Sequence, residues 1–263
     1  MDTLKAEDIL IRSDSDGVAT LTLNRPAARN ALSTGLMAAL QTELDEIAGN
    51  AAIRVVVIAA NGTAFCAGHD LREVRGTPTQ ESYKALFAQC SVLMLSITRL
   101  PQPVIARVHA TATAAGCQLV ATCDLAVAAE TAQFATPGVN IGLFCSTPMV
   151  AVSRNLGRKQ TMEMLLTGDM IDAGAAVAGG LVNRAVPKDE LDETVETYCR
   201  QIASKSPLTL KIGKEAFYRQ LEMPLENAYD YASEVMVTNM LARDAEEGID
   251  AFLEKRSPQW TGE

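Results

Sequence analysis

The chain has few of the residues from which metal sites are built. Only two histidines, His69 and His109, occur among its 263 residues, and no cluster of carboxylates supports them. The six cysteines show no paired metal-ligand spacing, and most of them lie in apolar stretches. The sequence therefore predicts no metal site, and we interpret the cysteines as reduced thiols of the protein core.

Basic residues are outnumbered as well. Lysine and arginine total 23 against 32 aspartates and glutamates, which gives a formal net charge of −9. The resulting negative field repels nucleic-acid phosphates and anionic membrane surfaces, so neither is an expected partner. An anionic ligand would need a local basic pocket.

No apolar run reaches the length of a membrane span, and the acidic N-terminus MDTLKAEDIL lacks the basic start and apolar run of a secretion signal. Hydrophobic residues make up 48% of the chain and charged residues 21%, which is ordinary globular usage. These features predict a packed cytoplasmic protein.

Strand and helix patterns alternate through the first half of the chain. Residues 18–24, 53–60, 103–109 and 125–130 have strand patterns, and apolar residues recur at helical spacing within 33–47 and 86–97. Alternation of this kind predicts an α/β fold. After about residue 148 the pattern is mainly helical, with one helix expected near 191–202 and two more within 225–255.

Two runs of small residues follow predicted strands. In AFCAGHDL, residues 64–71, Gly68 and the alanines let the backbone approach a ligand closely, although such a run is more often an ordinary turn. In HATATAAGCQL, residues 109–119, the small residues lead into a helix start expected at 117–120. The N–H groups of a first helical turn can stabilise an oxyanion, and close helix–strand packing is the alternative interpretation.

These two runs, together with NRP at 24–26, NAL at 30–32, QFATP at 133–137 and EGIDAFLEKR at 247–256, resemble the enoyl-CoA hydratase/isomerase (crotonase) superfamily over essentially the whole chain. The resemblance implies an α/β crotonase (ClpP-like) spiral of ββα units over residues 1–200. It also implies a C-terminal helical region over 201–263 that forms a homotrimer or a dimer of trimers. The implied substrate is a coenzyme A thioester, with no permanently bound cofactor.

The resemblance also implies roles for individual positions. The backbone N–H groups of His69 and Ala115 correspond to the oxyanion hole that polarises the thioester carbonyl. The positions implied to contact coenzyme A are Ala67, Asp70 and Leu71 on the adenine and pantetheine path, Arg25 and Arg29 near the phosphates, and Phe252 and Lys255 from a neighbouring helix or subunit. For each basic residue, a solvated surface charge is the alternative.

The hydratases of the superfamily carry a glutamate at each of two positions. This chain departs from that pattern, because it has Gln118 at the first position and Gly138 at the second. An amide cannot accept a proton at neutral pH and glycine has no side chain, so ordinary hydration should be severely impaired. Gln118 could orient a substrate oxygen or only fill the vacated position. The stretches HATATAAGCQLVATCDLAVA and FATPGVNIGLFCSTP resemble the branch of enoyl-CoA hydratase domain-containing protein 3.

Several functions remain open from the sequence. The leading hypothesis is an enzyme that stabilises a thioester enolate, by isomerisation, decarboxylation or retro-Claisen cleavage. The AGHD motif around His69 also occurs in decarboxylases of the superfamily, although Cys145 replaces their tyrosine. His69 could act as an acid, donate a hydrogen bond near the thioester or only fill space. The alternative from another class is a non-catalytic acyl-CoA carrier or sensor.

Overall fold

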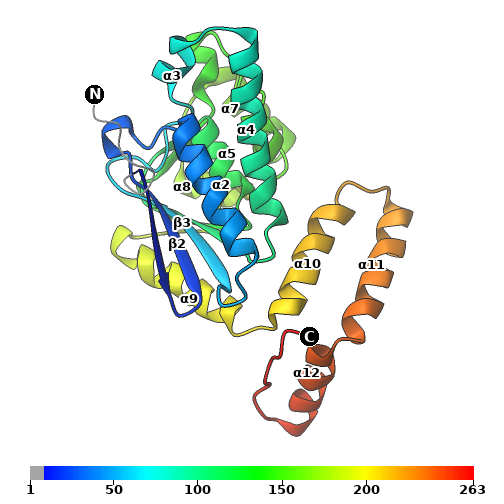
Figure 1. The fold of residues 1–263 in the computed structure, drawn as a ribbon. Coiled ribbons are helices and arrows are strands. Elements are labelled where there is room, and N and C mark those ends of the chain that lie inside the picture. The colour runs from blue at the N-terminus through cyan, green and yellow to red at the C-terminus, as the bar shows by residue number, and fades with distance from the viewer. Residues whose placement is uncertain (1–8) are drawn as a thin grey trace.

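The computed structural model describes residues 9–263, so most of the acidic N-terminal segment on which the secretion-signal prediction rested lies outside the described residues. A six-stranded sheet with the order β1-β2-β3-β4-β6-β9 forms the centre of the described chain (Figure 1). Its first two strands are antiparallel and all other neighbours are parallel. The strands are β1 (Leu10–Ser15), β2 (Val18–Leu23), β3 (Val55–Ala60), β4 (Val104–Val108), β6 (Leu125–Ala129) and β9 (Arg184–Val186).

A smaller sheet, with the order β5-β7-β8, lies beside the main one. Its strands are β5 (Ala112–Thr113), β7 (Gln133–Ala135) and β8 (Ile171–Asp172). The chain passes from β4 in the main sheet to β5 in the small sheet and then into helix α5 (Ala115–Thr122). The α/β class predicted from the alternating patterns is confirmed.

Helices cover both faces of the main sheet. On one face, α2 (Thr34–Ala48) and α4 (Gln80–Arg99) bury their apolar stripes against the larger core. Ser33 caps α2 as expected, because its hydroxyl accepts a hydrogen bond from the Leu36 N–H at 3.1 Å. On the other face lies α9 (Leu191–Ala203), and alternate residues of β3 contact the two cores.

The helical stripe predicted within α4 is buried except at Phe87, which is 42% exposed. Smaller helices complete the main body. They are η1 (Pro26–Ala28), α3 (Leu71–Gly76), η2 (Pro137–Ile141), α6 (Pro148–Val152), α7 (Arg158–Thr167), α8 (Ala173–Gly179) and η3 (Lys188–Glu190).

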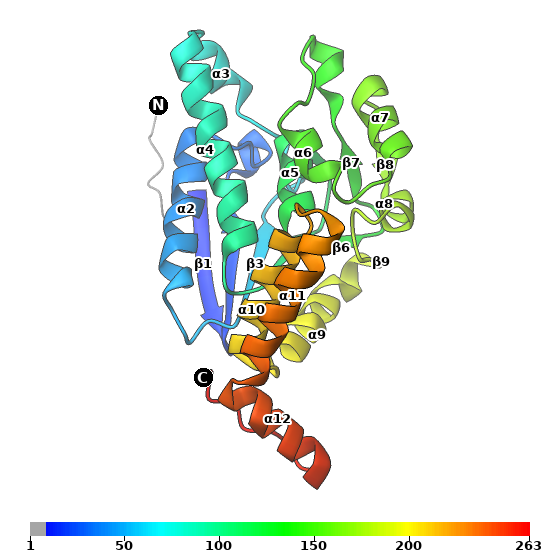
Figure 2. The same cartoon turned by 90° about the vertical axis from the view of Figure 1, so that its right-hand side faces the viewer.

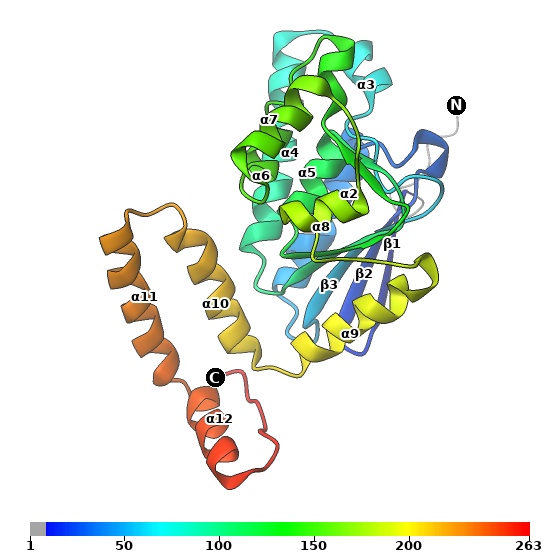
Figure 3. The ribbon, with the colours of Figure 1, turned by 180° about the vertical axis from the view of Figure 1, so that it is seen from behind.

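Helices α10 (Pro207–Gln220), α11 (Leu225–Met240) and α12 (Arg243–Glu254) extend away from the main body (Figures 2 and 3). A buried ion pair attaches α10 to that body, because Lys214 Nζ lies 2.6 Å from an Asp124 carboxylate oxygen and also donates to the backbone carbonyls of Ile97 and Gln102. The division of the chain after residue 200 stays a prediction, and α9 runs across that position. None of the helices in residues 9–263 combines the length and apolar character needed to cross a membrane.

Candidate active site

The first motif forms a turn that leaves one backbone N–H unpaired within the part of the chain that the structure describes. Leu32 donates to the Gly68 carbonyl at 2.8 Å and accepts from the Asp70 N–H at 3.1 Å, in the pattern of a parallel bridge. The N–H of His69, between these two residues, therefore points away from Leu32. It donates no hydrogen bond to any of the described residues.

The second motif places a helix N-terminus beside this turn. Helix α5 begins at Ala115, two residues before the start expected from the sequence. Ala114 has φ 50° and ψ −120°, a conformation that non-glycine residues rarely adopt, and such strain is often found at functional sites. The Ala114 N–H donates to the Ala135 carbonyl at 2.9 Å, whereas the Ala115 N–H, in the first turn of the helix, has no partner among the described residues.

Two glycines allow the motifs to meet. A Cβ added to Gly68 would lie 2.8 Å from Ala114 Cβ and 3.3 Å from Ala115 N. A Cβ added to Gly116 would lie 2.2 Å from the Cys66 carbonyl oxygen, so only glycine fits there. The structure thus brings together the two backbone groups that the resemblance implied, which are distant in sequence.

The His69 ring is enclosed beside this contact. Neither ring nitrogen is reached by solvent or has a hydrogen-bond partner among the described residues. The ring meets Phe87 edge to face, with centroids 5.7 Å apart and an interplanar angle of 79°. Burial lowers the pKa of His69 below its usual value and outweighs the backbone of Leu32 and the charge of Glu73, which raise it, so the ring is mostly neutral at pH 7. Unpartnered buried polar atoms are rare, and here they leave hydrogen-bonding capacity for a ligand.

The first of the two glutamate positions holds a buried amide. Gln118 lies on α5 and is 5% exposed, and its side-chain oxygen accepts only a long contact of 4.0 Å from the Cys90 thiol. Gln118 can orient a ligand oxygen through its amide nitrogen, but it cannot act as a base.

The second position is closed to any side chain. Gly138 lies in η2, where an added Cβ would be 2.6 Å from the Leu143 carbonyl oxygen and 2.9 Å from Cys145 Sγ. The loop that follows Gly138 therefore occupies the space a glutamate would need. The sequence indicated that this carboxylate is missing but gave no sign that its space is filled.

Most of the positions proposed to contact coenzyme A lie together around one turn, because the Ala67 N–H donates to the Arg29 carbonyl at 3.0 Å and Asp70 and Leu71 follow in the same turn. Arg25 pairs with Asp70 at 2.8 Å and also donates to the Ala31 carbonyl, so much of its guanidinium is used within the protein. Burial alone would raise the pKa of Asp70, but the hydrogen bond and charge of Arg25, together with the N–H groups of Arg72 and Glu73, outweigh it and lower this pKa. Arg29, Ala67 and Leu71 are exposed and could contact a ligand.

Phe252 and Lys255 lie on or next to α12, at the other end of the molecule from α3 and the Ala67–Leu71 turn (Figure 1). Within one chain they cannot contact a ligand bound at that turn. Their predicted role therefore depends on a neighbouring subunit.

The remaining candidates are part of the packing. All six cysteines are buried free thiols, as expected from the sequence, and burial raises the pKa of Cys66 to about 12. A ring nitrogen of His109 lies 2.9 Å from the Gly62 carbonyl oxygen. The contact between Phe87 and His69 was not predicted from the sequence. The place of Phe87 in the apolar helical stripe of residues 86–97 predicted burial in the core instead.

Comparison with known proteins identifies the relatives of this chain. Residues 13–263 match the enoyl-CoA hydratase/isomerase family. The human enoyl-CoA hydratase domain-containing protein 3 is 45% identical over 248 residues, which cover 94% of this chain and 82% of the relative. The 2,3-dehydroadipyl-CoA hydratase of Escherichia coli is 34% identical, with 96% and 98% of the two chains covered.

The likeness extends to solved structures. A crystal structure of an enoyl-CoA hydratase from Mycobacterium smegmatis has a TM-score of 0.94 and 53% identity, with 96% of this chain and 98% of that chain covered. The predicted crotonase fold and the resemblance to the branch of domain-containing protein 3 are both confirmed.

The comparisons correct one prediction. The relatives of that branch from human, rat, mouse, Xenopus laevis and Danio rerio are all named as mitochondrial proteins, which contradicts the expected cytoplasmic location. That expectation rested on the residues present at the N-terminus, and a targeting segment removed by cleavage leaves no trace in the sequence that remains.

Proposed function

This chain belongs to the enoyl-CoA hydratase/isomerase family, and from that premise we propose that it is an enzyme that binds an acyl-coenzyme A thioester and stabilises its enolate with the backbone N–H groups of His69 and Ala115. The observation that carries this proposal is the contact between the Gly68 turn and the start of α5, where both N–H groups lack a partner within residues 9–263. Preorganised donors of this kind are what an oxyanion requires.

The proposed catalysis depends on the negative charge that develops on the thioester during the reaction. When a bond to the carbon next to the thioester breaks, its electron pair moves toward the thioester carbonyl oxygen, which becomes an enolate oxyanion. Two fixed N–H donors stabilise that oxygen, and loss of a single oxyanion donor typically lowers the rate by about 10² to 10³-fold. Because the donors are backbone groups, substitution of the His69 side chain leaves the N–H in place.

The proposed reaction is one other than ordinary hydration. Hydration by the two-glutamate mechanism needs a general acid and base, and Gln118 and Gly138 supply neither. Loss of carbon dioxide from a carboxylated acyl group needs no base, since the electrons of the broken carbon–carbon bond form the enolate and a proton then adds to the carbon. Isomerisation and retro-Claisen cleavage are the other reactions that pass through an enolate.

A second candidate is a non-catalytic carrier or sensor of acyl-CoA. The closed space beside Gly138 favours it, because a pocket that has lost its carboxylates and filled one of their positions can still hold a thioester. Binding without turnover would distinguish this candidate from the enzyme.

Self-association as a trimer, or as a dimer of trimers, belongs to the same proposal. Large apolar side chains are exposed along the extended helices and would be covered by other subunits. The most exposed are Leu225, Tyr229, Leu241, Phe252 and Leu253. A mass measurement in solution by light scattering tests it, and a monomer at micromolar concentration would contradict it.

The test of the proposed function is mass-spectrometric turnover of short, long, branched and carboxylated acyl-CoAs by the wild type, His69→Ala and Gln118→Ala. Turnover of at least one thioester is expected, with no hydration of an enoyl-CoA. A substitution that removes turnover while binding persists would identify a catalytic side chain. Tight binding with no turnover of any thioester would refute the enzyme and support the carrier.

A further inference from the structure

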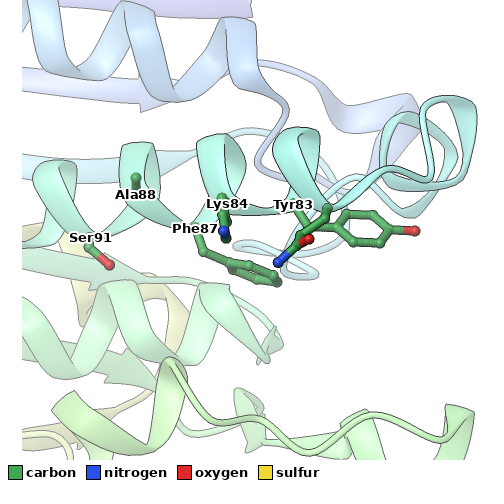
Figure 4. A pocket seen from close by; sticks show the side chains of 6 residues that line it. Tyr83, Lys84, Phe87, Ala88 and Ser91 are labelled. Carbon is green, nitrogen blue, oxygen red and sulfur yellow. The ribbon is translucent and has the colours of Figure 1, made fainter.

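A hollow of about 640 Å³ lies along α4 (Figure 4). Phe87 is one of its lining residues and is also the residue whose ring meets His69. The hollow therefore reaches the ring that contacts His69, beside the place proposed for the thioester. The hollow is shallow and largely open to solvent, because a single helix lines it.

The lining comes from successive turns of one helix. Its residues are Gln80, Tyr83, Lys84, Phe87, Ala88 and Ser91, and their spacing of three and four puts them on one side of α4. Phe87, which contacts His69, and Ala88 form the apolar middle of the lining, and the Ser91 hydroxyl follows toward the C-terminus of the helix. Toward the N-terminus of the helix it becomes polar, with an ammonium group, a phenol and an amide. This gradient suits a ligand with an apolar stem and a polar end.

Lys84 is the charged residue of this lining. It forms no ion pair within residues 9–263, and Glu81, one helical turn away on α4, does not pair with it either. Most of the protein surface repels anions, since the net charge is −9. A cation at the polar end of a hollow marks a place where an anionic group would be favoured.

We propose that this hollow receives the acyl chain and that Lys84 binds a carboxylate at the end of that chain, so that the substrate is a dicarboxylic acyl thioester. The inference rests on the proposed function, because the thioester at His69 and Ala115 is what directs the acyl chain past Phe87. With a rise of 1.5 Å per residue, Lys84 lies roughly 4.5 Å and Gln80 roughly 10 Å beyond Phe87 along the helix axis. An acyl chain of short to medium length spans that interval.

The test compares two thioesters of equal chain length that differ in the terminal carboxylate. Adipyl-CoA and hexanoyl-CoA are titrated calorimetrically into wild-type protein at low salt, and adipyl-CoA should bind about two- to fivefold more tightly, as expected for an ion pair with an exposed lysine. The Lys84→Met variant keeps the aliphatic stem and should lose this difference, whereas Lys84→Arg should retain it. Lys159→Met, at an exposed lysine of α7, is the matched control and should behave as wild type.

The outcomes separate this inference from the function on which it rests. Equal binding of the two thioesters by wild type would overturn the recognition of a carboxylate and leave acyl-CoA binding intact. If the Lys84→Met variant still bound adipyl-CoA more tightly than hexanoyl-CoA, another group would bind the carboxylate, and the assignment to Lys84 would be wrong. Binding of neither thioester would overturn the proposed function itself, and this inference with it.

Discussion

Replacement of Gly138 by alanine probes the closed position in the site with a single methyl group. The new Cβ would stand 2.6 Å from the Leu143 carbonyl oxygen and 2.9 Å from Cys145 Sγ. Distances this short force the loop to shift, and overpacking of a buried site typically costs about 1–3 kcal/mol. For a chain of this size each kcal/mol lowers the melting temperature by roughly 2–4 °C.

Thermal unfolding at a fixed protein concentration measures the effect, since self-association makes the melting temperature depend on concentration. Gly213→Ala is the matched control, because Gly213 lies within α10 with nothing within 4 Å of an added Cβ. That substitution should be neutral or stabilise the protein by about 0.5–1 kcal/mol through helix propensity. A Gly138→Ala variant as stable as wild type would refute the conclusion that the second glutamate position is filled.

Three further predictions concern stability and ionisation. Lys214→Met should lower the free energy of unfolding in urea by about 1.5–3 kcal/mol, because Asp124 loses its ion-pair partner but keeps the hydrogen bonds that it accepts from the Tyr218 hydroxyl and the Val104 N–H; a loss below about 1 kcal/mol would contradict this. Hydrogen bonds from Arg256 hold the pKa of Glu247 at about 2, so the stabilisation they give should be complete above pH 4.5 and lost as the pH falls toward 2. NMR titration of Glu247 would disprove this if its pKa were near 4.5. At pH 8 the cysteines of the native protein should react with a thiol reagent no faster than the chain unfolds locally to expose them. All six are buried, and burial raises the pKa of Cys66 to about 12.

Much of the fold was predictable because its local signals agree with its packing. The β-branched run of β3 predicted a strand covered on both faces, and α2 and α9 supply those covers. The start of α5 was placed two residues late, because the unusual backbone of Ala114 depends on tertiary contacts that no local pattern records. Phe87 belongs to the apolar stripe of α4, yet it is exposed beside the candidate site. The spacing of apolar residues along a helix does not show whether a given side chain faces the core or a pocket.

The candidate site was predictable only in part. The small residues of the two motifs indicated close backbone approach, and the contact of Gly116 with Cys66 is a case of it. The ion pair of Arg25 with Asp70 was missed, because the two residues are 45 positions apart and each had been assigned separately to the ligand. Likewise, the filling of the space at Gly138 depends on the path of a loop that the sequence does not specify.

The most direct test of the central claim is the infrared band of the thioester carbonyl in a bound acyl-CoA labelled with ¹³C at that carbon. Two hydrogen bonds from the N–H groups of His69 and Ala115 should polarise the carbonyl and move its band to lower wavenumber than in free acyl-CoA. The shift should persist in His69→Ala, because the backbone donor remains there. A bound thioester whose carbonyl band matches that of the free ligand would contradict the oxyanion site.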